Sequence, residues 1–255
     1  DNLDWRYENS AKDWATAYNV PPVRAGLIVR ERLKVNRVAP MLGLAFNMRR
    51  PQFQDRRVRE AFNLAFDFET AKRNFFFGLY DRLGSYFENS ELKATDLPQG
   101  RELELLKAAG PSVWPEVFTE RWRTPVAGTV SSARENLRKA HHLLGEAGWH
   151  IKDGQLVDKS GTQFAAEILL AQPSFERIAL AIKEPLERLG MKIFVRTVDA
   201  SQYKRRLDSF DFDIAFEQVA QSISPGTEQR EYFGSAAASR IGSKNMTGIA
   251  NPAVD

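Results

Sequence analysis

Residues 51–67 read Pro51-Gln52-Phe53-Gln54-Asp55-Arg56-Arg57-Val58-Arg59-Glu60-Ala61-Phe62-Asn63-Leu64-Ala65-Phe66-Asp67 and predict a capped helix. Asp55 stands where a side-chain oxygen accepts the free amide hydrogens of a helix N-terminus. Val58, Ala61, Phe62 and Ala65 follow at spacings of three and four, which builds one apolar face. The strand-like run Leu42-Gly43-Leu44-Ala45-Phe46-Asn47 comes just before. We therefore expect a strand that leads into an amphipathic helix.

The composition is that of an ordinary globular protein. The 255 residues, 43% hydrophobic and 27% charged, suffice for one large or two small domains. The longest apolar run is far shorter than the roughly 20 residues that span a bilayer. The 36 basic and 33 acidic residues leave a net charge of +3 and are mixed along the chain, so nucleic acid is not an expected partner. Because cysteine is absent, disulfides, thiolate nucleophiles and thiolate metal sites are excluded.

The rest of the pattern predicts an α/β fold. Residues 1–42 look separate, with aromatic side chains in a polar segment and a strand-like run at 27–33. Residues 78–130 are rich in Gly, Pro and Ser and predict a long irregular excursion, of a kind that is usually functional or mobile. From residue 133 on, helices and strands alternate, which argues for βαβ crossovers in a mixed, largely parallel sheet. The expected elements are helices 68–76, 103–108, 115–118, 133–148, 175–189 and 201–209, a hairpin at 151–157, and strands 164–170, 192–198 and 212–216.

Nothing in the sequence predicts catalysis. His141 and His142 are adjacent on an expected helix, where they point in different directions and do not chelate one metal, and His150 begins a hairpin. The motifs of serine hydrolases, zinc proteases and nucleotide-binding loops are missing from the sequence. We therefore expect a protein that is not an enzyme, without a metal or cofactor.

A polar loop is expected after strand 212–216. Polar groups at the carboxyl end of a parallel strand lie where ligands usually bind in open α/β sheets. Gln218, Gln221, Ser222 and Ser224 supply donors and acceptors at short range, which suits the main chain of a peptide. A plain surface loop is the alternative.

Two further clusters are candidates. Tyr86 and Phe87, beside Gly and Ser in an irregular segment, predict an apolar pocket wall, or packing of the loop against its own domain. Arginines gather at 49–50 and 56–59 and suit carboxylate recognition, although such arginines are usually only solvated.

Taken together, these motifs resemble the signature of the extracellular solute-binding proteins of family 5. The family pattern is an FN strand, then P-x-F-x-D-x-x-V-R-x-A and an Asp after the helix, and it matches Phe46-Asn47, residues 51–61 and Asp67. Residues 8–16, 85–92, 175–180 and 211–230 are similar to the YejA-like branch of the family. The resemblance covers essentially the whole chain.

The resemblance implies a periplasmic-binding-protein fold of type II, with two lobes around a cleft. Residues 1–42 would end the first lobe, residues 43–47 would form the hinge strand, and residues 48–255 would be the second lobe without its final helices. Gly43 suits a hinge because glycine tolerates large backbone changes. Asp1 is not an initiator methionine, so we expect an internal fragment, with a signal peptide upstream and a periplasmic location.

The resemblance also implies a function. We expect a monomeric receptor that captures oligopeptides or peptide-like compounds and delivers them to an inner-membrane ABC permease. A peptide-sensing or chaperone-like module of the same fold is the alternative. The expected ligand-binding residues are Asn47, Tyr86, Phe87, Glu217, Gln218, Gln221, Ser222, Ser224 and Arg230.

The chain departs from the family at one point. Many of these receptors hold the amino terminus of the peptide with an Asp in the loop that follows the strand matching residues 212–216. This loop carries Gln218, Gln221 and Ser222 instead, and Glu217 or Glu228 are possible substitutes. We therefore expect binding to depend less on a free amino terminus.

Overall fold

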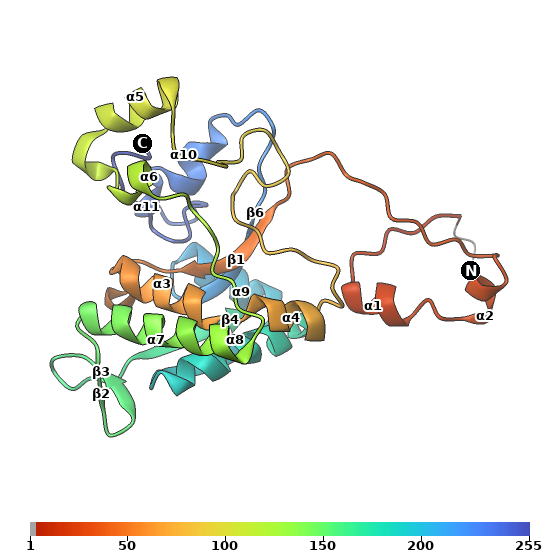
Figure 1. Ribbon diagram of the computed structural model, residues 1–255, viewed down its shortest axis with the longest axis horizontal. Helices are drawn as coiled ribbons and strands as arrows, with labels where there is room; N and C mark the ends of the chain where they lie inside the picture. Colours follow the sequence, from red (N-terminus) through yellow and green to blue (C-terminus); the bar gives the residue numbers. More distant parts are fainter. Residues whose placement is uncertain (1–3) are drawn as a thin grey trace.

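The computed structural model describes residues 4–255 and contains a mixed four-stranded sheet (Figure 1). The strand order is β1-β6-β4-β5. Strand β4 pairs in parallel with both β5 and β6, whereas β1 is antiparallel to β6. The bounds are Met41–Phe46 for β1, Ala165–Leu170 for β4, Lys192–Thr197 for β5 and Ile214–Val219 for β6. The predicted α/β fold with a partly parallel mixed sheet is confirmed.

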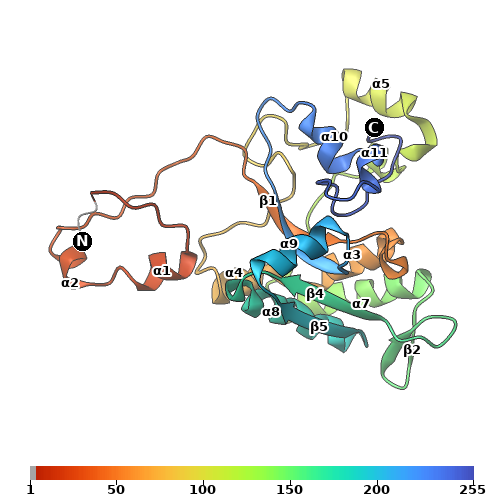
Figure 2. The same cartoon turned by 180° about the vertical axis from the view of Figure 1, so that it is seen from behind.

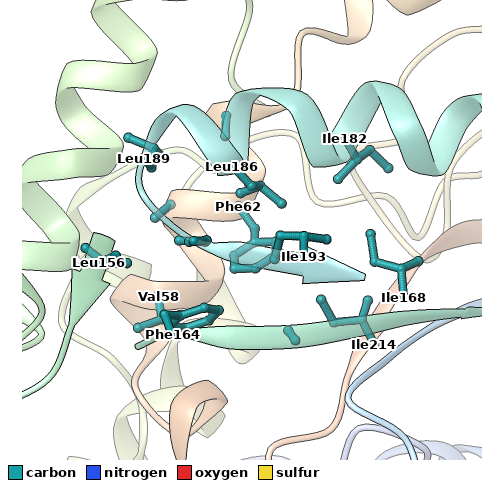
Figure 3. Packing of buried hydrophobic residues seen from close by; sticks show 14 of the residues in the cluster. Val58, Phe62, Leu156, Phe164, Ile168, Ile182, Leu186, Leu189, Ile193 and Ile214 are labelled. Carbon is teal, nitrogen blue, oxygen red and sulfur yellow. The ribbon is translucent and has the colours of Figure 1, made fainter. Parts of the chain in front are cut away.

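Both faces of the central strand β4 are buried. Ala166, Ile168 and Leu170 belong to the larger core, and Leu169 belongs to a smaller core on the opposite face, as expected from the two-residue period of a strand. Helices α3 (Arg56–Ala65), α7 (Val130–Glu146) and α8 (Glu176–Arg188) contribute to the larger core (Figure 3). Helix α9 (Ala200–Asp208) covers the other face through Tyr203 and Leu207. The sheet is therefore sandwiched between helices.

The helix predicted from residues 51–67 is confirmed as α3. Its N-cap Asp55 accepts a hydrogen bond from the Arg57 amide at 2.8 Å. The buried residues of α3 are Val58, Ala61, Phe62 and Ala65, the same four that form the predicted apolar face. The short helices η1 (Pro51–Phe53) and α4 (Phe68–Asn74) flank it.

The predicted hairpin is confirmed as β2 (His150–Lys152) and β3 (Gln155–Val157). Asp153 and Gly154 at its tip both have positive φ, 50° and 76°. Two-residue hairpin turns with the twist of paired strands require this conformation, which Asp-Gly adopts readily.

The predicted strand at 27–33 is wrong. These residues are all exposed and enter no ladder within the described part of the chain. An apolar run becomes a strand only when a neighbouring strand satisfies its backbone groups, and residues 27–33 lie in a segment that extends away from the sheet (Figures 1 and 2). The segment begins with α1 (Ala11–Thr16) and α2 (Pro21–Arg24).

The irregular excursion, residues 78–130, passes beside the C-terminal part of the chain (Figures 1 and 2). It carries α5 (Gly100–Ala108), η2 (Gly110–Ser112) and α6 (Glu116–Thr119), which confirms the short helices predicted there. Both views place α5 beside α10 (Glu228–Phe233) and α11 (Ser235–Ala238) (Figures 1 and 2). The remaining short helix, η3 (Pro173–Phe175), precedes α8.

Candidate functional site

The candidate site is built where β6 ends beside the start of β1. Met41 pairs with Val219, Leu42 with Gln218, and Gly43 with Glu217. The polar loop was expected to begin at Glu217, but β6 continues to Val219. Pairing with β1 extends the strand, because it satisfies the backbone groups of these residues. Glu217 and Gln218 are therefore strand residues whose backbones are fixed.

Glu217 is a partly buried residue. Burial raises its pKa from 4.5 to about 7, because desolvation disfavours the ionised form. Tyr203 of α9 and Tyr86 of the excursion lie close to it. Burial and then the charge of Glu217 raise the pKa of Tyr203 to about 12, and the same two causes raise the pKa of Tyr86. The Tyr203 hydroxyl donates to the Phe216 carbonyl at 2.7 Å.

The two aromatic residues predicted for the site, Tyr86 and Phe87, differ in their exposure and in their contacts. Tyr86 is 39% exposed, and its ring meets that of Phe233 in α10 edge-on, with 5.0 Å between the centroids. Phe87 is partly buried, and its backbone is held by the hydroxyls of Ser85 and Ser90. Tyr86 therefore joins the excursion to α10 and presents part of its ring to solvent.

The loop after β6 is braced by its own side chains. Gln221 exchanges two amide hydrogen bonds with Gln229 of α10, at 2.5 and 3.3 Å. Ser222 both accepts from the Ser224 amide and donates to the Ser224 carbonyl. Arg230 lies exposed on α10. The structure thus brings Gln221 against α10 and leaves Ser222, Ser224 and Arg230 at the surface.

An open pocket of about 410 Å³ lies at the end of β6. It includes two of the predicted residues, Gln218 and Gln221. The lining is completed by Arg37, Val38, Pro40 and Ala220. The sequence reasoning missed Arg37, Val38, Pro40 and also Tyr203, because their approach depends on strand pairing and helix packing and no local motif marks them.

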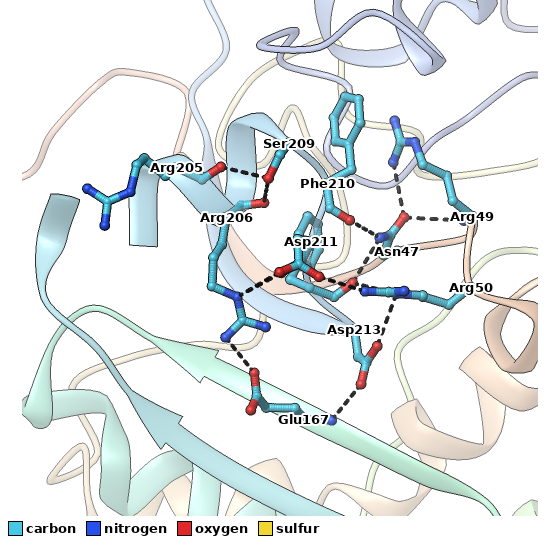
Figure 4. A network of polar contacts seen from close by, with 11 residues as sticks. Asn47, Arg49, Arg50, Glu167, Arg205, Arg206, Ser209, Phe210, Asp211 and Asp213 are labelled. Carbon is cyan, nitrogen blue, oxygen red and sulfur yellow. Dashed lines mark hydrogen bonds and ion pairs between the residues drawn. The ribbon is translucent and has the colours of Figure 1, made fainter. Parts of the chain in front are cut away.

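Asn47, the remaining predicted site residue, is buried in a polar network at the other end of β1 (Figure 4). Its amide nitrogen donates to the Phe210 and Phe212 carbonyls at 2.9 and 2.8 Å, and its oxygen accepts from Arg49. The geometry therefore gives Asn47 a structural role, joining β1 to the start of β6. Its contact with ligand stays a prediction.

The candidate arginines have protein partners. The guanidinium carbon of Arg49 lies 3.5 Å from the centroid of the Phe210 ring. The guanidinium nitrogens donate to the Asn245 and Met246 carbonyls. Arg50 pairs with Asp211 and Asp213. The partners of the others are Glu116 for Arg56, Asp55 for Arg57, and the Phe53 carbonyl for Arg59. These contacts give each arginine of the basic cluster a structural role within the protein.

Residues 4–255 offer neither a metal site nor a membrane-spanning helix. No group of three or more His, Cys, Asp or Glu side chains is placed to hold a metal ion there. Within the same residues, no helix is both long and apolar enough to cross a bilayer.

The fold is shared with a known class of protein. The chain superposes on the oligopeptide-binding protein AppA from Bacillus subtilis, solved with a nonapeptide, with a TM-score of 0.63 at 21% identity. The match covers 94% of this chain and 40% of AppA. The fold is thus that of the type II periplasmic solute-binding proteins.

The sequence comparison is more specific. The model of bacterial extracellular solute-binding proteins, family 5, matches residues 2–240, and the chain belongs to this family. It is 43% identical to the probable peptide-binding protein YejA of Agrobacterium fabrum, covering 99% of this chain and 42% of that protein. It is 38% identical to the peptidoglycan-binding protein YepA of the same organism, covering 95% of this chain and 40% of that one. The chain therefore spans about two fifths of the length of these relatives.

Proposed function

We propose that the protein is the substrate-binding component of an ABC importer that captures peptides or peptide-like compounds. The observation that carries the proposal is the pocket at the end of β6, together with the family. Its amide groups, Gln218 and Gln221, suit a peptide main chain. The partly exposed Tyr86 and the partly buried Glu217 lie beside each other, and we propose that they extend this lining. Such lining is typical of small-ligand sites.

The related proteins support the ligand class. The YejA relative carries the name of a peptide-binding protein, AppA was solved with a nonapeptide, and the YepA relative is named for peptidoglycan. A peptide component is common to these descriptions. We infer a ligand with a peptide backbone and place its contacts at Tyr86, Phe87, Glu217, Gln218, Gln221, Ser222, Ser224 and Arg230.

The mechanism that we propose is closure of two lobes. Residues 1–42 would end the first lobe, residues 43–47 would be the hinge strand, and residues 48–255 would be the second lobe without its final helices. The closed, liganded form would dock on an inner-membrane permease as a monomer, in the periplasm. Capture and release of a ligand by this mechanism require no catalytic residue.

Mass spectrometry of the full-length protein, purified from the periplasm of its host, tests this function. Native spectra are expected to show bound mass, and denaturing spectra are expected to show released peptides whose sequences define the ligand class. A clean ligand-free mass, together with no thermal shift against a peptide library, would contradict the proposal.

The Tyr86→Ala variant tests the position of the site. Loss of the exposed ring is expected to weaken binding of the dominant released peptide about tenfold or more, because aromatic contacts dominate such sites. Phe194→Ala is the matched control, because Phe194 is 47% exposed on β5, at the opposite edge of the sheet. Titration calorimetry measures both. Equal affinities for the two variants would place the ligand elsewhere.

A further inference from the structure

We propose that Asn89 is a positioning residue, whose side-chain amide clamps residues 35–39 and so shapes one wall of the pocket. Asn89 lies in the excursion, and its amide nitrogen donates to the Val35 carbonyl at 3.0 Å and to the Arg37 carbonyl at 2.8 Å. The backbone of the preceding residue contributes a third bond, in which the Ala39 amide donates to the Glu88 carbonyl at 2.9 Å. The inference rests on the proposed function of the pocket.

The clamp acts on a segment with little other support. Residues 34–40 form no helix or strand, and residues 34–37 are exposed. This segment nevertheless supplies Arg37, Val38 and Pro40, half of the residues that line the pocket. Val38 is only 5% exposed, so the segment is held in a defined place. Three hydrogen bonds from two adjacent residues provide that constraint.

The loop that carries Asn89 is itself rigid. The Glu88 carboxylate accepts from the Gly84 amide at 3.1 Å and pairs with Lys93. The Trp122 ring nitrogen donates to the Gly84 carbonyl at 2.9 Å. This braced loop, which also carries Tyr86, therefore holds the wall at residues 35–40 through Glu88 and Asn89.

The backbone of Asn89 fits this role. Its φ is 64°, in the left-handed region, which asparagine tolerates better than most residues. In this conformation the Asn89 side chain faces residues 35–37, and its amide group donates to the Val35 and Arg37 carbonyls. Because a pocket whose walls are already in place loses less entropy on binding, the clamp favours the ligand without touching it.

The Asn89→Gly variant of the full-length protein tests the clamp. Glycine keeps the left-handed backbone and removes both donors. The matched control is Asn251→Gly, which removes an amide that donates to the Ser112 carbonyl at 3.2 Å and also joins two distant segments. Asn89→Asp is the second variant, because it keeps the shape and lacks the donors.

Two measurements are made on each variant. Hydrogen exchange without ligand is expected to accelerate at the Ala39 amide, which donates to the Glu88 carbonyl, in both Asn89 variants and to stay unchanged in the control. The Kd for a synthetic copy of the dominant released peptide is expected to rise about tenfold in both Asn89 variants, with a melting temperature no lower than that of the control. A purely structural role would lower the melting temperature and leave the Kd unchanged.

The outcomes separate the clamp from the proposed function. Unchanged exchange at the Ala39 amide would overturn the clamp, whatever the ligand. Faster exchange with an unchanged Kd, or an Asn89→Asp variant that binds like the wild type, would overturn the positioning role. A wild-type protein that binds no peptide would overturn the proposed function and the positioning role with it, while exchange would still show whether the clamp exists.

Discussion

Replacing Phe164 with alanine is expected to lower the free energy of unfolding by about 3–5 kcal/mol. Phe164 is 1% exposed and stands just before β4. Its ring lies 6.0 Å from Phe53, 6.0 Å from Phe62 and 4.9 Å from Trp149, measured between centroids. The side chain therefore joins η1, α3 and the chain after α7 to the sheet, and its loss leaves a cavity that these elements fill poorly.

Urea unfolding followed by circular dichroism measures this effect. The control is Phe194→Ala, since Phe194 is 47% exposed, and its loss is expected to cost about 0.5 kcal/mol or less, as for other surface changes. A Phe164→Ala variant as stable as this control would contradict the packing described here.

Replacing Glu217 with glutamine is expected to stabilise the protein at pH 8 by about 3 kcal/mol, and to leave its stability nearly unchanged at pH 4. The pKa of Glu217 is raised from 4.5 to about 7 by burial. The folded protein therefore holds the proton more tightly than the unfolded chain does. This contribution to stability is fully present below about pH 4.5 and is lost as the pH rises to about 7.

Glutamine is the appropriate replacement because it has the shape of the protonated acid and does not ionise. The two phenols beside Glu217 stay neutral across this range, because the pKa of Tyr203 is raised to about 12 and that of Tyr86 is also raised. The difference in stability between variant and wild type therefore reports the titration of Glu217.

Chemical denaturation of both proteins from pH 4 to pH 8 checks this prediction. The matched control is Glu228→Gln at the start of α10, where the Gly226 amide donates to the carboxylate and lowers its pKa. That variant is expected to gain nothing at pH 8, since the charged form of Glu228 is the one that the fold stabilises. A difference between Glu217→Gln and the wild type that does not vary with pH would show that Glu217 is hydrated.

If Glu217 contacts the ligand as we propose, its protonation also affects which groups of a peptide it can bind. Below pH 7 a neutral carboxyl both donates and accepts hydrogen bonds, and above it the carboxylate only accepts. The prediction that binding depends weakly on a free peptide amine therefore applies most directly to acidic conditions. Comparing a peptide with its N-acetylated form at two pH values tests it.

The sequence by itself determined the elements whose causes are local. The Asp55 cap and the apolar spacing of residues 58–65 specify α3, because both act within one or two helical turns. Asp153-Gly154 specifies the hairpin, because the turn requires two residues with positive φ. The alternation after residue 133 predicted the mixed sheet for the same reason, since each strand and helix carries its own periodicity.

Only the tertiary structure decided where the candidate site lies. The apolar run at 27–33 found no strand to pair with and stayed exposed, whereas pairing with β1 carried β6 through Glu217 and Gln218. Asn47 became a structural link because carbonyls some 160 residues away in sequence reach its amide. Arg37, Val38 and Tyr203 come to the site by long-range packing. Such contacts join residues that no local pattern connects, because strand pairing and burial depend on the whole chain.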